Sequence, residues 1–260
     1  MIAVLDRLFR RLAGSSTAPW RPYIPFPPRS WVPDIVMLAL LIAITAALVE
    51  PTLLVRQDVA VRDFFAENTP TWAWWVYRTI VWTGQGGILG GASLAVAGLV
   101  SYRFSTVRPL VAWVGGYILM GFLAPFKWAT DRPAPRCGLD GPEPGRCGES
   151  MPYVDPDHAT LFQDLFPANS YPSGHALNTI VWCGMIVFCA GPLLKPWLRK
   201  AIVLVPPVTA TIGMLGLNYH WFWDIPAGML MGGIILRLVQ RVPWTRLPLP
   251  PLMEPERKYL

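Results

Sequence analysis

The chain has 260 residues, of which 53% are hydrophobic and 15% are charged, whereas about 25% charged residues are usual in soluble globular proteins. Its formal net charge is +6, but the basic residues lie between apolar runs rather than along one face, which argues against a nucleic-acid partner. The composition excludes an ordinary soluble domain and predicts a membrane protein.

The first 31 residues are predicted to form a cytoplasmic segment ahead of the membrane domain. Apolar residues recur at helical spacing from Ile2 to Leu12, and Arg7, Arg10 and Arg11 lie between them. This pattern is typical of an amphipathic helix on a membrane surface, with a disordered basic tail as the alternative. We expect no cleavable signal peptide. The Pro- and Ser-rich residues 15–31 are typical of a linker.

Six apolar runs follow, each near the ~20 residues that cross a bilayer as a helix. They lie at about 32–54, 80–101, 109–126, 174–193, 201–218 and 221–239. Glycines in the second run would let helices approach closely, and Pro206 and Pro207 should kink the fifth. The sequence therefore predicts an all-α bundle of six transmembrane helices over residues 32–240, followed by a cytoplasmic tail at 241–260.

The distribution of basic residues predicts the orientation of these spans. If the N-terminus is cytoplasmic, the inner segments hold 15 of the 22 lysines and arginines and the outer segments hold seven. An excess of Lys and Arg on the cytoplasmic side is the usual pattern in membrane proteins. We therefore expect both termini inside, in a multi-pass protein of the plasma (inner) membrane.

In that orientation, a long extracytoplasmic loop at about 127–173 joins the third and fourth spans, and its length suggests a functional role. Cys137 and Cys147 flank a Pro/Gly-rich turn in this loop. On an oxidising face they could form a disulfide, with free thiols as the alternative. Cys183 and Cys189 fall within the fourth span and are predicted to be packing residues.

Three polar clusters are predicted to lie at one membrane depth on the outer side. The third span ends at Lys127, the fourth begins at Tyr171-Pro172-Ser173-Gly174-His175, and the fifth ends at Tyr219-His220 with Asp224 opening the sixth. Ionisable groups at such a depth are costly unless paired or wet, so they indicate a site.

His220 and Asp224 are four residues apart, so they share a helix face and the carboxylate can accept a hydrogen bond from one ring nitrogen. That bond would fix the tautomer and raise the basicity of the other nitrogen. The alternative is an interfacial histidine beside an acidic residue at a helix N-terminus.

The Pro172-Ser173-Gly174-His175 run predicts a phosphate cradle. Pro172 suits the first turn of a helix, so the amide groups of Ser173, Gly174 and His175 would be unsatisfied donors at its N-terminus. A plain Ser N-cap is the alternative for Ser173.

Two cations in the outer loop are candidate phosphate ligands. Lys127 could bind phosphate or simply extend to the interface, and Arg132 could grip phosphate oxygens in a bidentate fork. Asp155, Asp157 and His158 could suggest a cation site, but a solvated helix start is the preferred interpretation, and we expect no metal or cofactor.

These residues resemble the type 2 phosphatidic acid phosphatase superfamily of integral-membrane lipid phosphatases. The family pattern is Lys, six residues and Arg-Pro, then PSGH, then Ser-Arg, five residues, His, three residues and Asp. PSGH is intact at 172–175 and His-x-x-x-Asp at 220–224, and the resemblance covers about 75–245.

The resemblance implies a role for each matching residue. His220 would be the nucleophile that forms a phosphohistidine, Asp224 would orient it, and His175 would protonate the leaving lipid oxygen. Ser173, Gly174 and Lys127 would bind the phosphate.

Both family arginines are missing from their positions. With six residues between, Lys127 is followed by Ala134-Pro135, and the family Ser-Arg falls on Gly213-Met214. Arg132 is the best substitute, followed by Arg136, with Arg78 remote. Bacterial relatives of the inositol phosphorylceramide synthases are similar in lacking the second arginine.

The sequence therefore predicts an enzyme that removes phosphate from a lipid, either a polyprenyl or a glycerolipid phosphate, on the extracytoplasmic side. The alternatives are a lipid head-group phosphotransferase and a non-catalytic phospholipid-binding membrane protein. Which lipid is used and the oligomeric state do not follow from the sequence.

Overall fold

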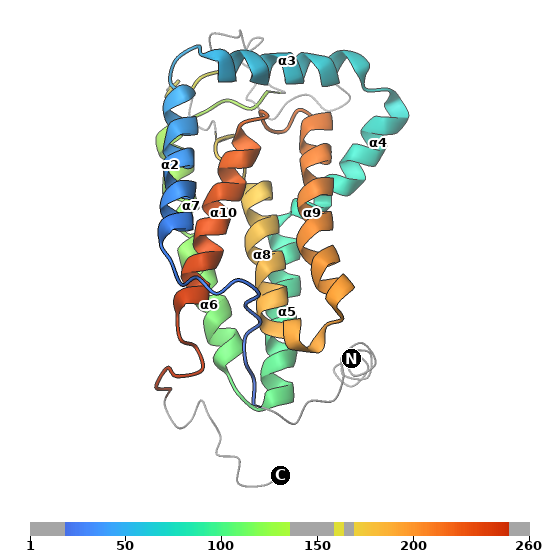
Figure 1. Ribbon diagram of the computed structural model, residues 1–260. Coiled ribbons are helices and arrows are strands. Elements are labelled where there is room, and N and C mark those ends of the chain that lie inside the picture. The colour runs from blue at the N-terminus through green and yellow to red at the C-terminus, as the bar shows by residue number, and fades with distance from the viewer. Residues whose placement is uncertain (1–18, 136–158, 164–168, 250–260) are drawn as a thin grey trace.

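The computed structural model describes residues 19–135, 159–163 and 169–249, which contain helices and no strands (Figure 1). Its α-helices are α2 (Val32–Ala47), α3 (Leu53–Asn68), α4 (Thr71–Ile80), α5 (Gly86–Phe104), α6 (Arg108–Met120), α7 (Leu123–Thr130), α8 (Gly174–Ala190), α9 (Pro196–Gly216) and α10 (Asp224–Arg241), with the 3₁₀ turns η1 (Val81–Gly84) and η3 (Gly191–Leu193). Several predictions concern residues outside these ranges: the amphipathic helix at 2–12, Arg136, the Cys137–Cys147 disulfide, and Asp155, Asp157 and His158.

Four segments of the described chain are long and apolar enough to cross a membrane: Gly86–Phe104, Arg108–Thr130, Gly174–Leu193 and Pro196–Gly216. Helix α2 is apolar but has only 16 residues, and α10 carries Asp224, Arg237 and Arg241. The all-helical character of the described residues and the multi-pass character of the protein are confirmed, whereas the count of six spans stays a prediction.

The C-terminal boundary of the first predicted span, 32–54, is wrong. Helix α2 ends at Ala47, and Leu53 begins a different helix, α3, which lies crosswise over one end of the bundle (Figure 1). Pro51 has no amide hydrogen with which to continue α2. Thr52 Oγ1 accepts a hydrogen bond from the Leu54 amide at 3.2 Å, which starts the new helix. The sequence analysis did not predict α3 or α4.

Helix α8 lies at the centre of the bundle and contacts α5, α9 and α10 (Figure 1). Twelve of its 17 residues are buried, so it is a core helix rather than a lipid-facing one. Cys183 and Cys189 are both buried, as predicted for packing residues. Helix α9 continues through Pro206 and Pro207 to Gly216, so the two prolines do not end it.

An ion cluster ties the bundle together at the end opposite α3. Arg237 donates two hydrogen bonds to the Asp34 carboxylate, at 2.8 and 3.1 Å, and Arg241 donates to the same group. Arg241 also donates to the carbonyls of Pro28 and Ser30. We call Asp34, Arg237 and Arg241 the distal ion cluster. It fixes the start of α2 to the end of α10.

The orientation of the bundle can be tested with single cysteines in a variant whose native cysteines are replaced by serine. Gln57 is exposed on α3, and Arg246 lies after α10. With both termini inside, a membrane-impermeant maleimide should label Gln57→Cys in intact cells, and Arg246→Cys only after permeabilisation. The reverse labelling pattern would contradict the orientation predicted from the distribution of lysines and arginines.

Candidate catalytic site

The three predicted polar clusters lie together at the α3 end of the bundle. The His175 and His220 ring centroids are 5.9 Å apart, with the rings at 66° to one another. Lys127, in the last turn of α7, donates a hydrogen bond from Nζ to the Pro172 carbonyl at 3.0 Å. The structure therefore brings a lysine and two histidines around one point, although they are far apart in the sequence.

His220 lies in the turn between α9 and α10, where Asn218 adopts a left-handed conformation with φ 51°. Its Nδ1 is 3.4 Å from Asp224 Oδ2 and 3.3 Å from Ser170 Oγ. Because Ser170 Oγ donates its own hydrogen to Asp224 Oδ2 at 2.6 Å, a proton on His220 Nδ1 satisfies all these groups. That tautomer leaves the lone pair on Nε2.

Burial lowers the pKa of His220, and the nearby Lys127 charge lowers it further, while Asp224 opposes both effects. The pKa therefore lies below its ordinary value of about 6.5, and the ring is neutral at neutral pH. A neutral ring with a free Nε2 is the form required of a nucleophile.

Ser173 is the N-cap of α8, since its Oγ accepts a hydrogen bond from the Ala176 amide at 3.3 Å. Its own amide donates to the Asp224 carbonyl at 2.9 Å, so one of the three donors predicted for a phosphate cradle is already used. Pro172 precedes the cap instead of lying in the first turn as predicted. The amides of Gly174 and His175 open the helix, where intrahelical partners are lacking.

Arg132 is fully buried, and its guanidinium lies between two carboxylates. Nη1 donates to Asp224 Oδ1 at 2.5 Å, Nη2 donates to Asp58 Oδ2 at 2.6 Å, and Nε donates to the Ala159 carbonyl at 2.8 Å. This differs from the fork on phosphate oxygens that the sequence predicted. The forked guanidinium instead donates to the carboxylates of Asp58 and Asp224, and it thereby orients Asp224. We call Asp58, Arg132 and Asp224 the site ion cluster.

Asp58 is a site residue that the sequence analysis missed. It is fully buried on α3, and its Oδ1 accepts a hydrogen bond from the Trp223 amide at 2.9 Å. Burial raises the pKa of Asp58 to about 6, and Arg132 acts against this rise. Because both carboxylate oxygens accept hydrogen bonds from N–H groups, the geometry holds Asp58 in its ionised form.

Ser170 was also missed, although it lies one residue before the Tyr171–His175 run. Its amide donates to the Arg132 carbonyl at 2.9 Å, and its hydroxyl joins Asp224 to His220. A serine in a long loop carries no signal of its own in a single sequence, so only the fold could reveal it.

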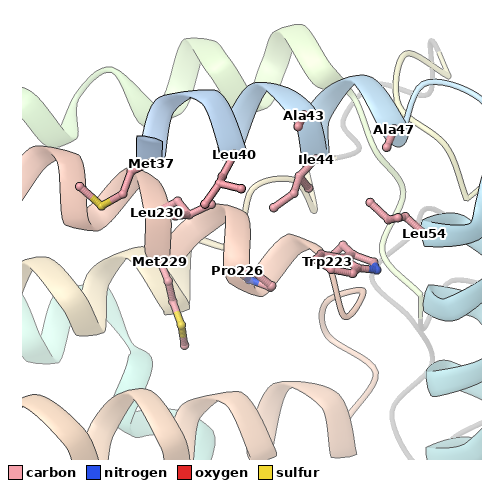
Figure 2. A pocket seen from close by; sticks show the side chains of 10 residues that line it. All are labelled: Met37, Leu40, Ala43, Ile44, Ala47, Leu54, Trp223, Pro226, Met229 and Leu230. Atoms are coloured by element: carbon pink, nitrogen blue, oxygen red, sulfur yellow. The ribbon is translucent and has the colours of Figure 1, made fainter. Parts of the chain in front are cut away.

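An apolar groove of about 700 Å³ begins beside this site (Figure 2). It runs between α2 and α10 and is lined by Met37, Leu40, Ala43, Ile44, Ala47, Leu54, Trp223, Pro226, Met229 and Leu230. Trp223 immediately precedes Asp224 and its amide donates a hydrogen bond to Asp58, so this end of the groove adjoins the site ion cluster.

Comparison with known proteins identifies the family and the fold. Residues 105–248 match the model of the PAP2 superfamily. The fold is similar to that of a transmembrane PAP2-type phosphatidylglycerolphosphate phosphatase from Bacillus subtilis, with 18% sequence identity and a TM-score of 0.60 over 81% of this chain and 94% of that one. A search of curated protein sequences gave no match.

The structural role of Arg132 predicts the effect of its removal. Arg132→Ala would leave two buried carboxylates without their shared cation, which should cost about 3–5 kcal/mol of stability. Thermal unfolding in detergent would measure the loss. Arg56→Ala, at an exposed position on α3, should change stability by less than about 0.5 kcal/mol. Equal, small effects of the two variants would contradict the role assigned to Arg132.

Proposed function

This chain belongs to the PAP2 superfamily, and we propose that it is an integral-membrane phosphatase that hydrolyses a lipid phosphate or diphosphate through a phosphohistidine at His220. The observation that carries the proposal is the convergence of two imidazoles, one of them oriented by a buried carboxylate, beside a lysine and a helix N-terminus. A nucleophile, an acid and fixed positive charge are what such a displacement requires.

The first chemical step is attack of His220 Nε2 on phosphorus. An N–P bond forms as the bond from phosphorus to the lipid oxygen breaks, and His175 gives its proton to that oxygen. Reacting atoms in a bound complex lie about 3–3.5 Å apart, so rings whose centroids are 5.9 Å apart can both reach one phosphoryl group. The buried Asp224 stabilises the charge that develops on the His220 ring.

The second step is hydrolysis of the phosphohistidine. Water attacks phosphorus as the N–P bond breaks, and His175 accepts the proton from the water. Positive charge for the phosphoryl oxygens comes from Lys127 and from the amides of Gly174 and His175 at the start of α8. The proposal includes no metal ion, and it places the site on the extracytoplasmic face.

The apolar groove supports a lipid as the substrate. Every lining residue is apolar except for the indole nitrogen of Trp223, so the groove suits hydrocarbon and offers little to a polar ligand. Because it begins at Trp223, a lipid whose phosphate lies at His220 could place its chain along α2 and α10 (Figure 2).

A head-group phosphotransferase is the second candidate function, because Met214 replaces the second family arginine at its position in the sequence. Met214 stands in its place, fully buried with its sulfur 3.2 Å from Ser173 Oγ. At the preceding position, a Cβ on Gly213 would lie 2.8 Å from the Val81 nitrogen, so a serine does not fit there. The phosphate pocket therefore differs from the pattern of the hydrolases.

Turnover assays distinguish the two functions. Purified protein should release inorganic phosphate from lipid phosphates in the absence of an acceptor alcohol. His220→Ala should lower this rate at least about a thousandfold, since the covalent intermediate cannot form. Formation of a new phospholipid only when an acceptor alcohol is added would favour the transferase. Unchanged phosphate release by the variant would eliminate His220 as the nucleophile.

The groove predicts a dependence on chain length. Leu40 is half exposed and lines the groove, so Leu40→Trp should raise the KM for a long-chain lipid phosphate about fivefold and leave a short-chain ester unaffected. Ile42→Trp is the matched control, because Ile42 is similarly exposed on the same helix but lies about 200° around it. Identical behaviour of the two variants would mean that the substrate chain lies elsewhere.

A further inference from the structure

The site ion cluster holds a carboxylate that no step of the proposed reaction uses. Asp58 contacts neither histidine; it meets the catalytic residues only through other groups. One oxygen accepts from Arg132, which also binds Asp224, and the other accepts from the Trp223 amide, which precedes Asp224 at the start of α10. Asp58 therefore holds Asp224 in two ways: through Arg132, which binds the Asp224 side chain, and through the Trp223 amide, which belongs to the backbone just before Asp224.

From these contacts we propose that Asp58 is a positioning residue, through which the crosswise helix α3 holds the Asp224–His220 pair in its reactive geometry. The role deepens the proposed function and rests on it. Asp58, Arg132 and Asp224 are all fully buried, so water cannot solvate the remaining charges if one of the three is lost.

The charge balance gives Asp58 an electrostatic effect on His220 as well. Arg132 divides its interaction between two carboxylates, so Asp224 keeps part of its negative potential for the His220 ring. If Asp58 became neutral, the arginine charge would act on Asp224 alone, and the potential at His220 would become more positive. The protonated form of His220 would then be disfavoured, and the pKa of the ring would fall.

Other charged groups around His220 stay the same in this comparison. Asp224 on α10 and Lys127 on α7 act on the ring directly, and His175 on α8 faces it at 5.9 Å between centroids. Arg62 on α3 lies over the Trp221 ring at 5.7 Å, next to His220 in the chain. A substitution at residue 58 removes none of these charged groups, so a shift of the His220 midpoint reports the loss of the Asp58 charge and of its contacts in the site ion cluster.

Asp58→Asn is the discriminating variant. The amide can still accept from the Trp223 N–H through its oxygen, but it then presents an NH₂ group to Arg132, where two donors face each other. Asp34→Asn is the matched control, because Asp34 is also a buried carboxylate held by arginines. It lies in the distal ion cluster, beside Arg237, which is about 20 Å along α10 from Asp224.

The titration of His220 can be followed without any turnover. The chain contains three histidines, so NMR of protein labelled at histidine Cε1 gives three signals, and His220→Asn identifies the one of interest. In Asp58→Asn the His220 midpoint should fall by at least about half a pH unit. In Asp34→Asn and in Asp58→Glu, which keeps the charge, it should remain near the wild-type value.

Kinetics on a lipid phosphate provide the second readout. Asp58→Asn should lower kcat at least about tenfold while KM changes less than about threefold, because orientation is lost and substrate contacts are not. Asp34→Asn should lower the melting temperature and leave kcat per folded molecule unchanged. An Asp58→Asn protein that loses only stability, with an unmoved His220 midpoint, would overturn the proposal.

A failure of the proposed function would look different. In that case the wild-type protein would show no phosphate release, and the NMR midpoints of the variants would still decide whether Asp58 acts on His220.

Discussion

The site depends on the burial of one guanidinium between two carboxylates. Removing Arg132 from water costs several kcal/mol, which is offset only if its donors meet well-placed acceptors. Here the acceptors come from α3, from α10 and from the Ala159 carbonyl. A single charged side chain therefore requires three separate parts of the chain to assemble before the cluster is stable.

Asp224 transmits this constraint to His220 and to the start of α8. Its carboxylate meets Arg132, Ser170 and His220, while its backbone carbonyl accepts from the Ser173 amide at the start of α8. The approach of the two helices is close, since a Cβ on Gly228 would lie 2.3 Å from the Ser173 carbonyl oxygen. The spacing of His175 and His220 is thus set by how α10 packs on α8.

The sequence predicted the parts of the site that have a local pattern. His220 and Asp224 share a four-residue spacing, and Lys127 and the Pro172–His175 run lie at the ends of apolar runs, so their meeting followed from topology. Asp58 and Ser170 have no such pattern, because their roles arise only from contacts with distant residues. Arg132 was found from the sequence, but its contacts with Asp58 and Asp224 were not predicted, since a fork that fits phosphate fits carboxylates equally well. The end of α2 was misplaced because apolar Leu53 and Leu54 follow it directly and belong to the crosswise helix.

The position of α3 in the chain limits where the protein can be truncated. The region that matches the family model begins at residue 105, whereas Asp58 lies well before it. A fragment that begins at residue 105 would retain His175, His220 and Arg132. It would lack Asp58, so the buried guanidinium of Arg132 would lose one of its two carboxylate partners. In this chain, residues upstream of the family signature therefore complete the ion cluster that surrounds Asp224.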